Sequence, residues 1–152
     1  MWGHSMGGGA TLKVLTIDPH VKAAVIYSSV SADFAELAYG CSSSDILPLD
    51  LPADLTASYF NSVTDPEILK AVSPLYHLDK VTAPVQINYG TKDGLAFARV
   101  PPEWAKKMYK GFIDADKDAQ IFSQEGEGHS FIGEPWFVFM LRSLKFFDKY
   151  VK

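Results

Sequence analysis

The sequence has a single cysteine, Cys41, and no group of cysteines and histidines with the spacing of zinc ligands. One thiol cannot form an intramolecular disulfide. A disulfide framework and a structural zinc site are therefore excluded, and we expect neither a metal nor another cofactor. Cys41 is interpreted as a small, half-buried side chain rather than a reactive thiol.

The sequence also has little net charge, because it contains 14 basic and 18 acidic residues and its net charge is −4. Without a basic stripe, we expect neither nucleic acid nor an anionic membrane as a partner. The longest strongly apolar run, 136–141, is far shorter than the roughly 20 residues that span a bilayer. The first residues lack the basic and apolar regions of a signal peptide, so we expect a cytoplasmic protein.

The 152 residues, 47% of them apolar and 21% charged, suit one globular domain over 1–152. Residues 21–28 are rich in β-formers with little alternation, which is typical of a strand covered on both faces in a parallel sheet. Strands alternating with helices predict a three-layer α/β/α architecture. We predict strands at 21–28, 84–89 and 119–123, and helices at 6–16, 56–62, 66–71, 102–112 and 134–150.

Two segments have alternative interpretations. Residues 31–80 are irregular, and we interpret them as an excursion that caps the site. The helix at 134–150 could present a membrane or partner surface, but we favour a core helix packed on the sheet. Its charged residues can share one outer face; they are Arg142, Lys145, Asp148 and Lys149.

The strongest chemical signal is Gly3-His4-Ser5-Met6-Gly7, which matches the G-x-S-x-G nucleophile elbow. In such an elbow the serine stands on a sharp strand-to-helix turn, and side chains at the flanking glycines would clash. The following helix points its first N–H groups at the same place, so the Met6 N–H is a candidate oxyanion donor. Gly8 and Gly9 favour close packing of that helix, although they also fit a flexible loop.

A serine nucleophile needs a base, and four histidines are available. His129 lies in a glycine-rich loop directly after a predicted strand, where loops face the same end of the sheet as the elbow. The side chain of His4 is expected to point away from the serine oxygen, which leaves a structural or pocket role. His20 and His77 are expected to be solvated or structural.

The base needs an acid to orient it. Asp93 follows the predicted strand 84–89 through a short turn, although a plain turn aspartate is the alternative. Asp79 precedes its strand and so lies at the wrong end, as do the aspartates of one charged loop, Asp114, Asp116 and Asp118. The order Ser5, Asp93, His129 is that of α/β-hydrolases.

The sequence resembles the catalytic domain of prolyl-oligopeptidase-like serine hydrolases and is also similar to dienelactone-hydrolase-type esterases. The resemblance lies in five stretches, at 3–8, 73–78, 83–93, 125–131 and 146–150. It implies Ser5 as nucleophile, Asp93 as acid and His129 as base in the hydrolysis of an acyl bond.

The resemblance also implies an N-terminally truncated α/β-hydrolase fold. The strand before the elbow is expected to be essentially absent, together with the loop that supplies the second oxyanion N–H. The predicted activity is hydrolysis of small carboxylic esters through an acyl-enzyme. The alternatives are a serine peptidase fragment and a folded fragment that assembles without catalysis. The apolar strand 21–28 would have an open edge, which predicts a homo-oligomer.

Overall fold

The computed structural model describes residues 1–40, 65–95 and 100–151. The predicted helix at 56–62 and Cys41 lie outside these residues. The strands are β1 Trp2–His4, β2 Ala24–Tyr27, β3 Val85–Gly90 and β4 Ala119–Gln124. The α-helices are α1 Met6–Leu15, α2 Phe34–Gly40, α4 Pro66–Val72, α5 Pro102–Asp114 and α6 Glu134–Tyr150, and η1 Pro74–Lys80 is a 3-10 helix.

The four strands form one parallel sheet in the order β1-β2-β3-β4. The expectation that the strand before the elbow is essentially absent is wrong, because Trp2–His4 forms β1 and pairs with Val25–Tyr27. A further main-chain bond runs from Val25 N to the carbonyl of Met1. The strand predicted to have an open edge is therefore interior, and β1 is the edge strand on that side.

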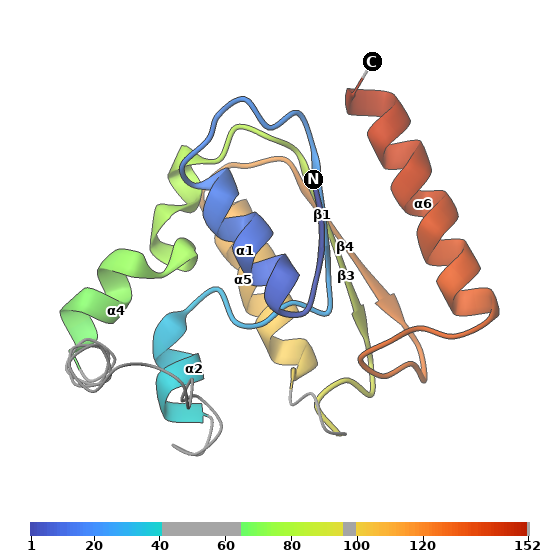
Figure 1. Ribbon diagram of the computed structural model, residues 1–152, viewed down its shortest axis with the longest axis horizontal. Coiled ribbons are helices and arrows are strands. Elements are labelled where there is room, and N and C mark those ends of the chain that lie inside the picture. Colours follow the sequence, from blue (N-terminus) through green and yellow to red (C-terminus); the bar gives the residue numbers. More distant parts are fainter. Residues whose placement is uncertain (41–64, 96–99, 152) are drawn as a thin grey trace, which may run out of the picture.

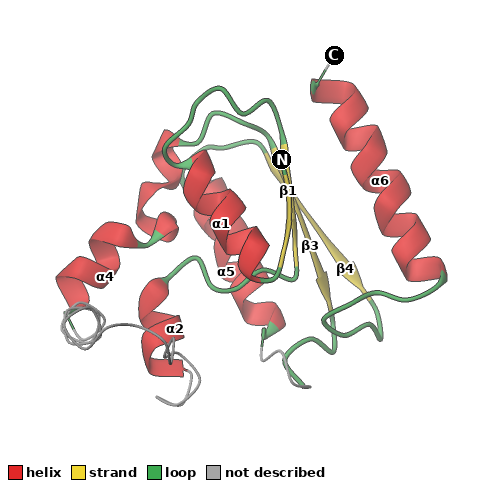
Figure 2. Cartoon of the chain, viewed as in Figure 1, coloured by secondary structure: helices red, strands yellow, loops and turns green. Residues whose placement is uncertain are grey.

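Helices cover both faces of the sheet, with α1 and α5 on one side and α6 on the other (Figure 1). The side chains of β2 show why its sequence is apolar without alternation. Ala24 and Ile26 pack with residues of α1 and α5, whereas Val25 and Tyr27 pack with residues of α6. The predicted three-layer α/β/α architecture is confirmed, and the alternation of strands and helices is visible along the chain (Figure 2).

Helix α6 packs on the sheet as expected, through Phe139, Ser143 and Phe146, which are all buried. Its other faces are less polar than predicted, since Phe137 is 63% exposed and Leu144 55% exposed. Among the described residues no helix is long and apolar enough to cross a membrane.

Candidate active site

The elbow residue Ser5 lies between β1 and α1 with φ 55° and ψ −123°, a backbone conformation that L-residues rarely adopt. The turn is tight at Gly3, where an added Cβ would lie 2.2 Å from the carbonyl oxygen of Gly7. The predicted clash is wrong for Gly7 itself, since a Cβ there meets nothing within 4 Å. The expected close packing holds at Gly8, whose Cβ would lie 2.7 Å from that of Ser29.

Helix α1 begins directly after Ser5. The carbonyl oxygen of Ser5 accepts from Gly8 N at 3.0 Å and Gly9 N at 3.3 Å. The N–H of Met6 is in the first turn, where main-chain N–H groups have no acceptor within the helix. The positive end of the helix dipole adds to the attraction of these groups for a developing negative charge. The Met6 side chain is 78% exposed, so it leaves this helix end open.

The structure brings Asp93 and His129 together at the carboxyl ends of β3 and β4. Nδ1 of His129 lies 3.1 Å from Oδ1 and 3.2 Å from Oδ2 of Asp93. A carboxylate accepts only, so Nδ1 carries the proton and Nε2 is left free to act as a base. The Asp93 side chain is 1% exposed and that of His129 19% exposed, which shields the pair while leaving the imidazole accessible.

Close contact between two loops produces this pairing. The turn after β3 donates from Lys92 N to the carbonyl of Glu127 at 2.9 Å. Gly90 lies so near the loop after β4, which carries His129, that an added Cβ would be 2.3 Å from Glu127 O and 2.4 Å from Gly128 O. The carboxylate of Asp93 also accepts from Gly94 N at 2.9 Å, which fixes its direction.

Ser5 adjoins this pair through its neighbour His4. The His4 ring lies 4.7 Å from the His129 ring, centroid to centroid. Its Nε2 is 2.9 Å from the main-chain oxygen of His129. In the part of the chain that the structure describes, no hydrogen bond joins the Ser5 hydroxyl to His129. Catalytic contacts of this kind are often long before substrate binds.

The ring of Tyr27 lies beneath His4 and next to Phe131. The pKa of Tyr27 is raised to about 12, chiefly by burial and also by the negative charges of Asp93 and Glu127, although the bond from Phe131 N acts to lower it. The hydroxyl therefore remains protonated across the physiological range.

His20 and His77 make contacts away from the Asp93–His129 pair, as expected. His20 is bound to Asp18, with its side chain 91% exposed, and His77 Nε2 donates to the carbonyl of Ala71. Within residues 1–40, 65–95 and 100–151, no group of three or more metal-ligating side chains could hold a metal ion.

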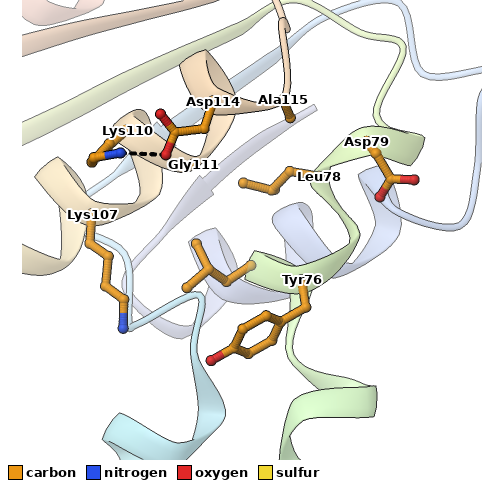
Figure 3. Close-up of a pocket in the computed structure, with 9 residues that line it drawn as sticks. Tyr76, Leu78, Asp79, Lys107, Lys110, Gly111, Asp114 and Ala115 are labelled. Atoms are coloured by element: carbon orange, nitrogen blue, oxygen red, sulfur yellow. Dashed lines mark hydrogen bonds and ion pairs between the residues drawn. The ribbon is translucent and has the colours of Figure 1, made fainter.

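The rejected acids Asp79 and Asp114 line a different hollow of about 460 Å³, between η1 and α5 (Figure 3). Its lysines are engaged: Lys110 pairs with Asp114 at 2.5 Å, and Lys107 pairs with Asp33 and Glu36, both at 2.9 Å. No serine, threonine or cysteine is among the described residues that line this hollow. The candidate chemistry is therefore at the sheet edge that carries Ser5.

The model of the prolyl oligopeptidase family matches residues 1–152. The chain belongs to this family. Its fold and elbow place it in the α/β-hydrolase superfamily, which confirms the resemblance seen in the sequence. No curated protein matches the chain at a significant level.

Solved structures with the same fold come from the larger peptidases. A puromycin-hydrolyzing peptidase of Mycobacterium tuberculosis is 25% identical with a TM-score of 0.74, over 98% of this chain and 21% of that one. An acylaminoacyl peptidase of Pyrococcus horikoshii is 22% identical with a TM-score of 0.70, over 98% and 23%. A dipeptidyl peptidase 4 of Porphyromonas gingivalis is 19% identical with a TM-score of 0.70, over 98% and 19%. This member of the prolyl oligopeptidase family thus spans about a fifth of the length of these neighbours.

Proposed function

We propose that Ser5, His129 and Asp93 form the catalytic triad of a serine hydrolase that cleaves acyl bonds. The observation that carries the proposal is the buried Asp93 carboxylate bound to Nδ1 of His129. A serine held at φ 55° follows His4, whose ring lies 4.7 Å from that of His129. This arrangement supplies the three roles that acyl transfer needs, a nucleophile, a base and an orienting acid.

In the proposed reaction, the Ser5 oxygen attacks the substrate carbonyl carbon while its proton passes to Nε2 of His129. The carbonyl electron pair moves onto oxygen, where the Met6 N–H stabilises it. The tetrahedral intermediate then collapses, and the imidazolium protonates the departing amine or alcohol. Water attacks the resulting acyl-enzyme through the same base, releasing the acid and restoring Ser5.

We infer that the bond cleaved is an amide in a short peptide or acylated amino acid, so the peptidase alternative is the better one. Family membership supports this choice, as do neighbours described as peptidases. The expectation of small carboxylic esters has no such support, and activated esters are the easier chemistry for the same triad. The cap role of 31–80 and the cytoplasmic location stay predictions.

The test is a fluorophosphonate probe, which should add one label to the chain and none to a Ser5→Ala variant. Equal labelling of both proteins would refute the assignment. Turnover of alanine p-nitroanilide beside p-nitrophenyl acetate then separates amide from ester cleavage. Labelling with no turnover of either substrate would identify a fragment that is not a complete catalyst.

A further inference from the structure

We propose that His4 and Tyr27 form a two-point clamp that positions the general base, with His4 as the decisive positioning residue. This inference rests on the proposed role of His129, because the clamp acts on the loop that carries it. Neither residue is assigned a place in the reaction itself. His4 contacts the main chain of the loop at His129, and Tyr27 contacts it at Phe131.

The first point of the clamp is His4. It lies directly opposite Tyr27 in the pairing of β1 with β2, and the two rings stack with centroids 4.4 Å apart and planes inclined by 24°. The Nε2 atom of His4 is 2.9 Å from the carbonyl oxygen of His129. A carbonyl oxygen only accepts, so Nε2 must carry the proton and donate it.

The second point is the hydroxyl of Tyr27, whose oxygen accepts from the main-chain N–H of Phe131 at 2.5 Å. Tyr27 is 2% exposed and Phe131 5% exposed, so water does not compete for this bond. The Phe131 ring packs on Tyr27 at 4.5 Å and edge-on to Phe139 at 5.7 Å, which ties the loop to α6.

The loop's own sequence restrains residues 128–131 little, because its internal bond, from Ile132 N to Glu127 Oε2 at 3.0 Å, joins residues on either side of them. Gly126 has a positive φ of 79°, and a Cβ at either Gly126 or Gly128 would meet nothing within 4 Å. Ser130 is exposed to solvent. The clamp holds the main chain on both sides of Ser130 and so fixes the position from which the His129 ring meets Asp93.

The clamp also links the base to the nucleophile, because His4 immediately precedes Ser5 in the elbow. A displacement of about 1 Å in a catalytic group can lower the rate by about a hundredfold. Aromatic packing that merely stabilises the fold would instead change the unfolding temperature and leave the reactive fraction working at its normal rate. The two roles are therefore separable by experiment.

The decisive comparison is His4→Phe, which keeps a stacking ring but lacks the donor, against His4→Gln, which retains a side-chain N–H. His20→Phe is the matched control, since that ring is remote from the site. Two measurements are made on the whole chain. The first gives the maximal rate constant of inactivation by the fluorophosphonate together with its binding constant, and the second gives the NMR signals of the His129 ring nitrogens.

We expect His4→Phe to lower the inactivation rate constant about tenfold with an unchanged binding constant. We also expect its His129 ring signals to shift away from those of the wild type. In His4→Gln the inactivation rate constant should lie within about threefold of the wild-type value. Its His129 ring signals should lie close to those of the wild type. A wild-type rate constant and a wild-type His129 spectrum in His4→Phe would overturn the clamp. A slower rate with an unchanged His129 spectrum would also overturn it, as would an equal loss of rate in His4→Phe and His4→Gln.

Two further arms keep the result decisive. If His4→Phe does not fold, Tyr27→Phe removes the hydroxyl that accepts from Phe131 N and keeps the ring, and it should shift the His129 signals in the same way. Unshifted signals would overturn the clamp. If wild-type Ser5 takes no label, the proposed function fails. The NMR comparison then decides the clamp alone: shifted signals that glutamine restores support it, and unshifted signals refute it.

Discussion

Replacing Gly90 by alanine is expected to separate the Asp93 turn from the His129 loop. The new methyl group would lie 2.3 Å from Glu127 O, whereas ordinary van der Waals contact begins near 3.4 Å. The three nearest atoms, Glu127 O, Gly128 O and Glu127 C, all belong to the main chain, so no flexible side chain can swing away. One loop must therefore move by about 1 Å, which is enough to lower the rate by about a hundredfold.

The same displacement lengthens the 2.9 Å bond from Lys92 N to Glu127 O. Forcing a methyl group into such a packed contact typically costs about 1–3 kcal/mol of the free energy of unfolding. The assay is the inactivation rate constant of the fluorophosphonate, measured with the thermal midpoint. The matched control is Gly128→Ala in the same loop, because its Cβ would meet nothing within 4 Å.

We expect Gly128→Ala to keep the wild-type rate and, through a less flexible unfolded chain, a midpoint at or slightly above wild type. A Gly90→Ala protein that reacts and melts like the wild type would refute the reasoning. Equal losses in both variants would also refute it, since the loss would then reflect any change in the loop rather than the contact at Gly90.

The remaining predictions concern the proposed triad, Tyr27 and the sheet edge. Asp93→Asn should lower the inactivation rate by about 10³–10⁴ while circular dichroism stays native, because the imidazole loses the acceptor that fixes its tautomer. His129→Ala should abolish labelling and His77→Ala should not; the reverse result would exclude the proposed base. Burial raises the pKa of Tyr27 to about 12 from 10.0. Its stabilising contribution is thus complete below pH 10 and lost as the pH rises towards 12, so the wild-type melting temperature should fall more steeply than that of Tyr27→Phe in this interval. We propose a homodimer through β1, an edge strand of the described sheet, where Trp2 is 43% exposed. Light scattering should then give twice the chain mass, and Trp2→Lys should reduce that mass. A monodisperse monomer would contradict the proposal.

The sequence alone predicted the architecture and the Asp93–His129 pairing. Strand-forming runs and helical runs alternate, and parallel strands bring their carboxyl ends to one edge of the sheet. Residues placed directly after successive strands are then expected to meet. Asp93 and His129 do so, and Ser5 stands at the same edge in its strained turn. Local pattern suffices here because each residue lies within a few positions of an element that the pattern predicts well.

Local pattern failed where the deciding contact joins distant segments. Trp2–His4 is too short to show an alternation of its own, and it forms a strand only because β2 offers it a partner. The two elbow glycines look equivalent in the sequence, yet only at Gly3 does another part of the chain come close enough to exclude a Cβ.

The role of His4 also depends on the tertiary structure. The sequence predicts a His4 side chain that points away from the serine oxygen and has only a structural or pocket role. Its contact with the carbonyl of His129 depends on the register of β1 against β2 and on the path of a loop 125 residues later. Such contacts arise when the sheet and α6 pack together, because packing sets the distances between segments that sequence spacing leaves free.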